Sequence, residues 1–169
     1  PKRWRDDPAL APAATHTWSP IVNLHIWYDR PVADFDFLAF INSPVQWVFN
    51  RTRIGELQGR GDYLTVSLSG AWEHWSKTKD NLRELFLPEL ERLLPQAKGA
   101  SVERFVVVKE QRGTFRSLPG APENRLGART PVANLVLAGD WTNTGWPATM
   151  ESAVRSGNSA ASSIQEYAS

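Results

Sequence analysis

The sequence predicts an α+β protein with a mixed, largely antiparallel sheet, followed by one buried strand and a C-terminal helix. Residues 20–31 alternate between apolar and polar side chains, as a half-buried strand does. Residues 79–94 carry apolar side chains at helical spacing. A short, continuous apolar run at 133–139 precedes a helix of small residues, a pattern typical of a buried parallel strand and the helix after it. The 169 residues suffice for one domain of ordinary size.

The composition argues against several classes of protein. The 19 basic residues almost balance the 18 acidic ones, so the chain lacks the basic field that holds a nucleic acid backbone. Without cysteine it forms neither a disulfide nor a thiolate metal site, and its three histidines are too scattered to suggest a metal or a catalytic triad. These features favour a cytoplasmic protein without a metal. Because the chain begins with Pro1 and its only methionine is Met150, we expect a fragment of a longer protein.

The first half of the chain is predicted to be mainly strand. Residues 1–19 mix charged residues with proline and alanine without a period, which predicts an arm or linker. The strand at 20–31 ends at Pro31. Residues 45–50 and 62–70 are two further strands with a glycine-containing turn between them, so we expect the three strands to form an antiparallel meander.

The middle of the chain is predicted to be a helix, a strand and a long irregular crossing. Pro88 is expected to bend the helix at 79–94, and Pro95 to end it. The strand at 101–111 has an all-apolar centre, so we expect both of its faces to be covered. Residues 115–131 have the proline and glycine content of an irregular segment.

The apolar face of the C-terminal helix, predicted from about Pro147 to Tyr167, consists mostly of small side chains. Because glycine costs a helix up to about 1 kcal/mol relative to alanine, Gly157 on this face indicates close approach to a sheet. We therefore expect Gly157→Leu to prevent folding. Glu151 and Arg155 lie four residues apart and are expected to form a surface ion pair. The face comprises Met150, Ala153, Val154, Gly157, Ala160, Ala161 and Ile164.

A ligand site is predicted where the run at 133–139 ends and this helix begins. Asp140 directly follows Gly139 at the end of the run, and its carboxylate can accept hydrogen bonds from hydroxyl groups. Pro147 suits a first helical turn, which leaves the N–H groups of residues 148–150 without intrahelical partners. A flavin nucleotide uses both kinds of group, through its ribityl hydroxyls and through a pyrimidine edge that becomes negative on reduction. The alternative is that Asp140 caps a turn and the helix end faces water.

Other residues allow two interpretations. The eight tryptophans either fill the core or line an apolar ligand cavity. His25 is in phase with Trp27 on a predicted strand and is either a structural side chain or one that faces such a cavity. Arg112 and Arg116 flank the loop after the strand at 101–111, and they are candidates to meet cofactor phosphates or a pyrophosphate-bearing precursor.

The segment LAGDWTNTGWPATMESAVRSGNSAA resembles the C-terminal flavin motif of the phytoene-desaturase and amine-oxidase superfamily. More narrowly, it resembles the squalene-associated FAD-dependent desaturases, the hydroxysqualene dehydroxylases of hopanoid biosynthesis. SPIVNLHIWYDRPV and FVVVKEQRGTFRSLPG are similar to the same group, so the resemblance runs from about Ser19 to the C-terminus.

The resemblance implies a cofactor, FAD, and its contacts in this chain. Gly139 and Asp140 would contact the ribityl-phosphate part of FAD, and the backbone at 148–150 would face the flavin C2 carbonyl. The residues assigned in this way to the cofactor site are Gly139, Asp140, Trp141, Gly145, Trp146, Ala148, Thr149 and Met150.

The resemblance also implies a division of the chain. Residues 20–131 would belong to a substrate domain whose tryptophan and phenylalanine side chains wall a tunnel for a long isoprenoid, and residues 132–169 to the FAD-binding domain. The dinucleotide fingerprint G-x-G-x-x-G is missing, since the nearest approach, GRGDYL at 59–64, ends in leucine and precedes a predicted strand. We therefore expect the N-terminal Rossmann unit to lie in a preceding part of the protein and this chain to be inactive alone.

The expected function is that of an FAD-dependent oxidoreductase exchanging a hydride with a squalene-type or carotenoid-type precursor. No side chain of the sequence is an obvious catalytic base. One alternative is a flavin amine oxidase, in which Trp141 and Trp146 would flank the flavin. Another is a non-catalytic module that binds an apolar ligand or a protein. Expected partners are the isoprenoid, the N-terminal FAD-binding part, a membrane surface for the complete enzyme and a second copy of the fragment.

Overall fold

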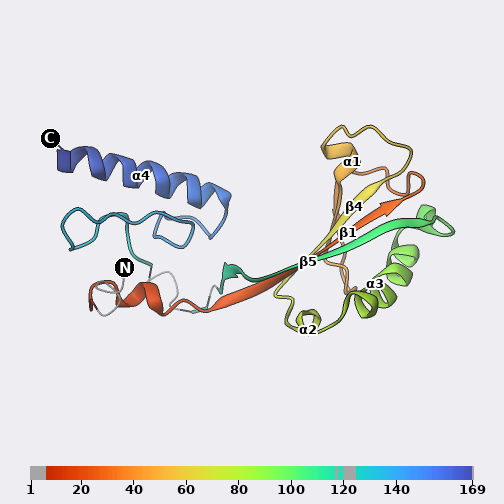
Figure 1. Ribbon diagram of the computed structural model, residues 1–169, viewed down its shortest axis with the longest axis horizontal. Helices are drawn as coiled ribbons and strands as arrows, with labels where there is room; N and C mark the ends of the chain where they lie inside the picture. The colour runs from red at the N-terminus through yellow and green to blue at the C-terminus, as the bar shows by residue number, and fades with distance from the viewer. Residues whose placement is uncertain (1–6, 117, 120–124, 169) are drawn as a thin grey trace. The chain divides into compact units, whose positions relative to one another are not determined.

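The computed structural model describes residues 7–116, 118–119 and 125–168, and it divides the chain into two compact units (Figure 1). The sheet unit comprises Ser19–Gly113, and the C-terminal unit comprises the residues before Ser19 and after Gly113. The segments 7–18 and 114–116 therefore group with the C-terminal helix and not with the sheet. The assignment of 20–131 to a substrate domain and of 132–169 to an FAD-binding domain stays a prediction.

The sheet is antiparallel, with the strand order β2-β3-β4-β1-β5. Its strands are β1 (Trp18–Tyr28), β2 (Phe37–Ala39), β3 (Trp47–Asn50), β4 (Tyr63–Ser69) and β5 (Val102–Phe115). The strands predicted at 20–31, 45–50, 62–70 and 101–111 are confirmed, but the predicted meander is wrong in its pairing, because β1 pairs with β4 and is not a neighbour of β3. No sequence pattern predicts β2, because this three-residue edge strand has all its residues exposed and lacks the alternation of a half-buried strand.

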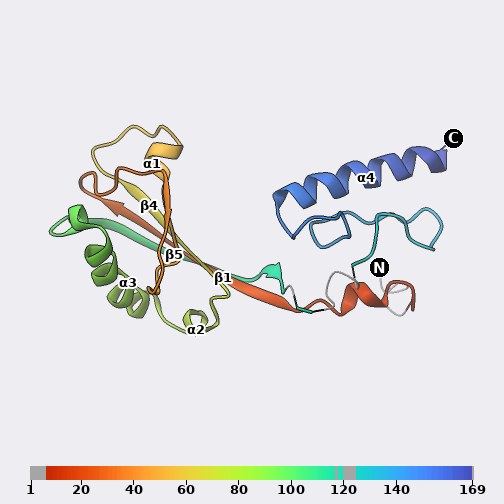
Figure 2. The same cartoon turned by 180° about the vertical axis from the view of Figure 1, so that it is seen from behind.

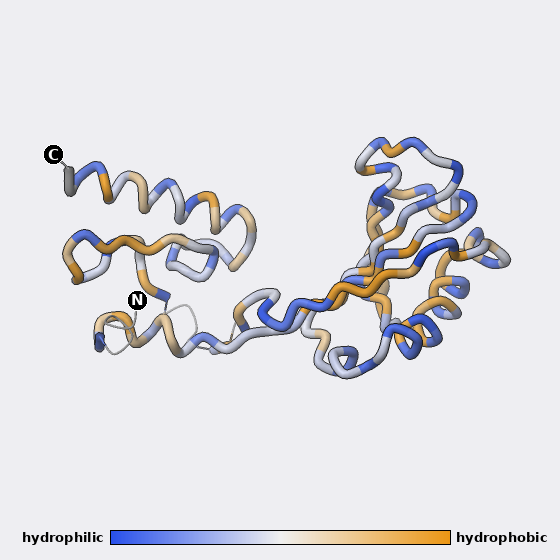
Figure 3. Tube along the Cα trace, in the orientation of Figure 1, coloured by the Kyte–Doolittle hydropathy of each residue, from blue (hydrophilic) through white to orange (hydrophobic). Residues whose placement is uncertain are grey.

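One face of the sheet forms the core together with α3 (Lys79–Leu93). Alternate residues of β1 and β4 face each other across the ladder, as in the pairs Leu24–Val66 and Ile26–Leu64, and all four side chains are fully buried. Three residues of α3 at helical spacing, Leu82, Phe86 and Leu90, are equally buried. Both ribbon views show α3 on one side of the sheet (Figures 1 and 2), and hydrophobic stretches follow the central strands (Figure 3).

The predicted helix at 79–94 is confirmed, and it begins at a capping box. The Thr78 hydroxyl accepts a hydrogen bond from the Asn81 N–H at 3.2 Å, while the Asn81 side chain accepts one from the Thr78 N–H at 3.3 Å. Pro88 lies inside the helix. The short helices α1 (Arg51–Ile54) and α2 (Trp72–Trp75) and two 3₁₀ turns (Ala11–Ala14 and Pro95–Ala97) complete the elements before β5.

The opposite face of the sheet is open, and we call it the aromatic face. The expectation that both faces of the strand at 101–111 are covered is wrong, because Val108 is 48% exposed. An all-apolar strand centre therefore does not require a second covering layer here. The aromatic face comprises Asn23, His25 and Trp27 of β1, Phe37 of β2, Trp47 and Phe49 of β3, and Tyr63, Thr65 and Ser67 of β4.

The C-terminal unit contains one long helix, α4 (Met150–Ala168). It begins three residues after the predicted start at Pro147. The predicted strand at 133–139 is wrong: these residues are partly exposed and form a single antiparallel bridge, between Arg129 and Val136. A parallel strand needs neighbouring strands for its N–H and C=O groups, and no strand borders this segment among the described residues.

The buried face of α4 also differs from the predicted one. Its buried residues include three serines, Ser152, Ser156 and Ser163, whereas Val154 is 61% exposed. A side chain built at Gly157 would meet nothing within 4 Å, so this glycine does not mark a close approach. The predicted close approach is therefore wrong for the described residues, and the effect of Gly157→Leu on folding stays a prediction without that support. The ion pair between Glu151 and Arg155 is confirmed, at 2.7 Å.

Candidate functional site

The loop of residues 139–149, which we call the motif loop, is held by a single guanidinium. Arg125 donates hydrogen bonds to the main-chain oxygens of Asp140 at 2.8 Å and Trp146 at 2.6 Å. It also donates to the main-chain oxygens of Trp141 and Thr142. One charged side chain thus satisfies four carbonyl groups of an irregular segment that has no ladder of its own.

Arg125 is partly buried and lies beside an aromatic ring and a carboxylate. The guanidinium carbon lies 5.3 Å from the centre of the Phe115 ring. Burial lowers the pKa of Arg125, and the negative charge of Asp140 acts in the opposite direction. Sequence reasoning missed Arg125, because a lone arginine in an irregular segment gives no periodic or motif signal.

Gly139 is the position of the motif loop where only glycine fits. Its φ is 147°, a conformation that side chains rarely adopt. A Cβ atom built there would lie 2.4 Å from Nε1 of Trp141. The Gly139 N–H donates to the Ser156 hydroxyl at 2.8 Å. The backbone before Asp140 is therefore fixed against the second turn of α4.

The motif loop and the start of α4 lie together, as the sequence predicts. The Ser152 hydroxyl donates to the main-chain oxygen of Asp140 at 3.1 Å. The first amides of the helix differ from those expected: the helix begins at Met150, and Thr149 precedes it as the N-cap residue, its hydroxyl accepting from the Ser152 N–H at 3.4 Å. The N–H groups that lack an intrahelical partner therefore include those of Met150 and Glu151, whereas Ala148 and Thr149 precede the helix.

The two tryptophans of the motif loop have separate partners. The ring of Trp141 meets His16 edge-on at 6.2 Å between centres. Trp146 is 45% exposed, and the Arg155 guanidinium lies 4.7 Å from its ring centre. Gly145, between them in sequence, has a φ of 76°. No stacked pair of Trp141 and Trp146 is present among the ring contacts of the described residues.

These features fit the flavin contacts expected from the motif. One short segment contains the Asp140 carboxylate, helix N–H groups without intrahelical partners, and Gly139, which has no side chain. Met150 at the start of the helix is 88% exposed. The negative edge of a reduced flavin is favoured at a helix N-terminus. The cofactor role of each predicted residue of this segment stays a prediction.

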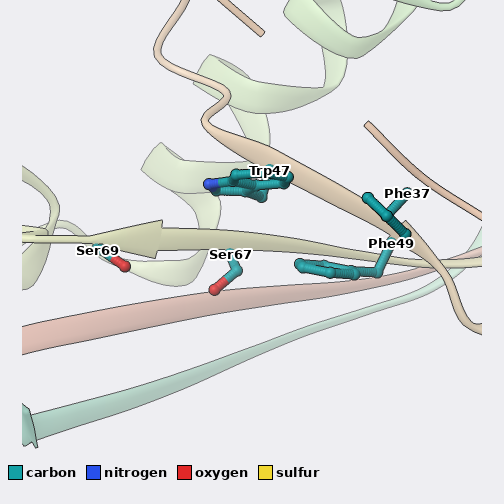
Figure 4. Close-up of a pocket in the computed structure, with 5 residues that line it drawn as sticks. All are labelled: Phe37, Trp47, Phe49, Ser67 and Ser69. Atoms are coloured by element: carbon teal, nitrogen blue, oxygen red, sulfur yellow. The ribbon is translucent and has the colours of Figure 1, made fainter. Parts of the chain in front are cut away.

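A separate site lies on the aromatic face of the sheet unit. Phe37, Trp47 and Phe49 line an open cavity of about 430 Å³ together with Ser67 and Ser69 (Figure 4). The ring centres of the three aromatic residues lie 6.2–6.4 Å apart. Phe37 and Trp47 are exposed and Phe49 is half-buried, and together the three rings offer an apolar surface for a ligand.

A second cavity of about 280 Å³ shares Phe49 and Ser67 with the first. Its remaining lining residues are polar or aromatic: Asn23, His25, Arg51, Tyr63 and Thr65. His25 therefore faces a cavity, the second of the two interpretations of this residue. The two cavities adjoin at Phe49 and Ser67, and we call the pair the groove, with an apolar end and a polar end.

His25 and Tyr63 form the centre of the polar end. Nδ1 of His25 lies 2.7 Å from the Tyr63 hydroxyl and 3.3 Å from the Thr65 hydroxyl. The Tyr63 ring stacks on Trp27, with ring centres 4.3 Å apart and planes 6° from parallel. Burial, and then the positive charge of Arg51, lower the pKa of His25, so its imidazole is neutral near pH 7.

Neither a metal centre nor a membrane span is found in the described part of the chain. Its histidine and carboxylate side chains nowhere gather in a group of three that would hold a metal ion. Its helices are too short or too polar to cross a bilayer.

Comparison with known proteins identifies the family of the chain and with it the class of flavin oxidoreductases. Residues 3–165 match the flavin containing amine oxidoreductases, so the chain belongs to this family. The family is flavin-dependent, and FAD is its implied cofactor.

Curated relatives cover nearly all of the chain. It is 31% identical to 15-cis-phytoene desaturase of Narcissus pseudonarcissus over 99% of its length and 36% identical to hydroxysqualene dehydroxylase of Sinorhizobium fredii over 83%. The chain spans 31% of the length of each of these relatives. The superfamily predicted from the C-terminal motif is thereby confirmed.

Solved structures show the same fold at low identity. A proposed protoporphyrinogen oxidase from Exiguobacterium sp. 255-15 matches with a TM-score of 0.71 and 10% identity, over 95% of this chain and 37% of its own. An oxidoreductase from Methanosarcina mazei matches with a TM-score of 0.60 and 18% identity, over 95% and 38% of the two chains.

Proposed function

We propose that this chain is the C-terminal part of an FAD-dependent oxidoreductase that exchanges a hydride between the flavin and a long isoprenoid. The observation that carries the proposal is the groove on the aromatic face, whose apolar end is lined by Phe37, Trp47 and Phe49. An uncharged polyene gains affinity mainly by burying apolar area, and aromatic rings supply that area. Two relatives of the chain, a 15-cis-phytoene desaturase and a hydroxysqualene dehydroxylase, support the same class of substrate.

In this proposal the motif loop supplies part of the cofactor site. The Asp140 carboxylate accepts hydrogen bonds from the ribityl hydroxyls, and the amides of Met150 and Glu151 face the pyrimidine edge. Bound FAD supplies the hydride chemistry. The chain's own residues bind the substrate, orient it and keep water from it.

The amine oxidase alternative has weaker support. An aromatic pair flanking the flavin would require Trp141 and Trp146 to act together, whereas their rings contact His16 and Arg155 respectively. The groove also has no carboxylate among its lining residues to pair with an ammonium group. Both observations favour an apolar substrate.

The remaining parts of the proposal concern partners and location. We propose that an N-terminal FAD-binding part completes the cofactor site, and that the chain without it dimerises through the surface which that part would cover. We further propose a cytoplasmic enzyme that draws its substrate from a membrane surface, since a long isoprenoid partitions into lipid.

The test uses a protein that carries this chain together with the family's dinucleotide-binding segment. It should purify yellow with flavin absorbance, and this chain alone should be colourless. Asp140→Ala should weaken FAD retention by about 1.5–3 kcal/mol through the loss of charge-assisted hydrogen bonds. Ser159→Ala, an exposed change on α4, is the control. A colourless protein whose melting temperature and fluorescence ignore added FAD would establish the non-catalytic module instead.

The substrate class needs its own measurement. Anaerobic mixing of the yellow protein with a squalene-type or phytoene-type isoprenoid should change the flavin spectrum, and mixing with a monoamine should not. The opposite result would favour the amine oxidase alternative.

A further inference from the structure

Strand β5 ends the sheet on one side, and its outer edge is long. The strand order stops at β5, so among the described residues no strand borders its outer main-chain N–H and C=O groups. β5 has 14 residues, whereas β2 at the opposite edge has three. A long edge strand is a template for pairing with a further strand unless prolines or charges protect it. The edge of β5 therefore needs either such protection or a partner.

The centre of β5 has neither a proline nor a charged side chain. Its middle is the apolar run of Val106, Val107 and Val108, of which Val108 is 48% exposed. Charged side chains flank this run on both sides. An apolar centre between charged ends suits a strand whose own ends carry matching charges.

A second copy of β5 fits this pattern in one register. When two copies of a strand pair antiparallel about a two-fold axis, opposite residues lie on the same face of the joined sheet, so the axis passes through a residue. With the axis at Val107, Arg104 of each copy lies opposite Glu110 of the other, and Val106 lies opposite Val108. Two opposite-charge pairs then enclose an apolar centre.

The neighbouring registers fit less well. An axis one residue toward the C-terminus would place Arg104 opposite Arg112, which brings like charges together. An axis one residue toward the N-terminus would place Glu103 opposite Lys109. The Lys109 ammonium already donates hydrogen bonds to two main-chain oxygens in and after α2, each at 2.6 Å. The axis at Val107 is therefore the favoured one.

The charges that this register uses are available. Arg104 and Glu110 are exposed, and neither forms an ion pair within the part of the chain that the structure describes. The Arg104 guanidinium carbon lies 4.8 Å from the centre of the Trp27 ring, and the Glu110 carboxylate accepts a hydrogen bond from the Arg112 N–H at 3.1 Å. Neither contact neutralises a charge, so each side chain can still pair with an opposite charge.

We infer that the outer edge of β5 pairs antiparallel with the same edge of a second copy of this chain, with a two-fold axis at Val107 and ion pairs between Arg104 and Glu110. The pairing joins two five-stranded sheets into one continuous sheet. The inference rests on one part of the proposed function, the dimerisation of the chain alone, and gives that dimer its surface. It depends on neither the flavin nor the isoprenoid.

Charge reversal tests the register in the 169-residue chain, and sedimentation velocity over a range of concentrations measures dimerisation. Arg104→Glu and Glu110→Arg should each weaken dimerisation by about tenfold, because each change turns both opposite-charge pairs into like-charge pairs. The double variant restores opposite charges and should dimerise as wild type does. Glu103→Arg is the matched control, because Glu103 lies opposite the uncharged Gln111 in this register.

A single cysteine at the axis gives a second readout that involves no charge. The chain contains no cysteine of its own. Val107→Cys should form a covalent dimer on mild oxidation, because opposite residues of antiparallel strands have Cα atoms about 4.5–5.5 Å apart, within the reach of a disulfide. Val102→Cys is the control, since its two copies would lie roughly 30 Å apart along the strands. Circular dichroism checks that each variant is folded, and if Arg104→Glu unfolds, Glu110→Arg and the cysteine pair decide.

The outcomes separate this inference from the proposed function. Rescue by the double variant, together with cross-linking at 107 and not at 102, would establish the β5 interface. If a dimer forms but ignores the charge reversals, or if both cysteine variants cross-link equally, the dimer uses another surface and the inference is wrong. If the chain is monomeric at every concentration, the inference and the proposed dimerisation both fail. The flavin function, tested by the yellow colour of the longer protein, would stand in either case.

Discussion

The Arg125 guanidinium donates to the main-chain oxygen of Asp140 at 2.8 Å, so the acid of the flavin motif is positioned by a residue outside that motif. The hydrogen bonds that Arg125 donates to the motif loop go to main-chain oxygens, so they do not use the Asp140 carboxylate. The motif loop therefore depends on two parts of the sequence, of which only one resembles a known motif.

Arg125→Leu should loosen the motif loop. It removes hydrogen bonds to four carbonyl groups, and we expect the loop to lose about 1–3 kcal/mol of stability against local opening. Amide hydrogen exchange at Thr142 and Asn143 measures this opening. Arg53→Leu, which removes an exposed ion pair with Asp36 in the sheet unit, should change exchange there by at most a few tenths of a kcal/mol. Equal protection in the two variants would contradict the role given to Arg125.

Gly139→Ala should destabilise the same loop for a different reason. The new methyl group would meet the Trp141 indole while the backbone keeps a φ of 147°, and strain of this kind costs about 1–3 kcal/mol. Gly127→Ala is the control, because a Cβ there meets nothing within 4 Å and its φ is not in the strained range. Thermal unfolding compares the melting temperatures of the two variants, and we expect that of Gly139→Ala to be lower. Similar melting temperatures would show that Gly139 tolerates a side chain.

Gly157→Ala should stabilise α4. The position is inside an exposed helix with open space for a methyl group, and replacing glycine by alanine there gains up to about 1 kcal/mol. Helix content by circular dichroism during thermal unfolding measures the gain. A loss of stability would restore the earlier expectation that this face of α4 packs closely against another element of the chain.

Tyr28→Phe should raise stability, most of all at high pH. The Tyr28 hydroxyl is buried and has no hydrogen-bond partner among the described residues, so removing it should raise the free energy of unfolding by about 1 kcal/mol at neutral pH. Burial, and then the negative charge of Glu91, raise the pKa of Tyr28 to about 12 from its usual value of 10.0.

The sign of the pH effect follows from that shift. The folded protein holds the phenolic proton of Tyr28 more tightly than the unfolded chain does. The resulting contribution to the free energy of unfolding is fully present below pH 10 and is lost as the pH rises toward 12. Urea unfolding between pH 8 and pH 11 should show a steeper decline for wild type than for Tyr28→Phe. Parallel pH profiles of the two proteins would contradict the prediction.

Periodicity was enough to predict the elements whose partners lie within the chain. In β1, every second residue from Pro20 to Tyr28 is buried, because α3 and the neighbouring strands cover that side. In α3, the spacing of Leu82, Phe86 and Leu90 identifies the buried face for the same reason. Each pattern and its partner are encoded in the same sequence.

The sequence was less informative where packing depends on a neighbour that the pattern does not specify. The apolar run at 133–139 has the composition of a buried strand, but the described residues provide it with no adjacent strand. The face of α4 is a similar case: Ser152 and Ser156 are buried because their hydroxyls bond to the backbone of the motif loop, which hydrophobic periodicity does not detect. For the candidate sites, the family motif located Asp140, while Arg125 and Tyr63 emerged only from the structure.

Consecutive residues of strands β1, β3 and β4 lie on opposite faces of the sheet, one buried in the core and the next on the aromatic face. Leu24 and Val66 lie in the buried core, whereas their neighbours His25 and Thr65 line the cavity of the proposed substrate site. Residues of the cavity can therefore change with less loss of stability than residues of the core. A randomised library confined to positions 23, 25, 47, 49, 63, 65 and 67 should yield mostly folded variants with altered binding, whereas one confined to the intervening positions should yield mostly aggregates.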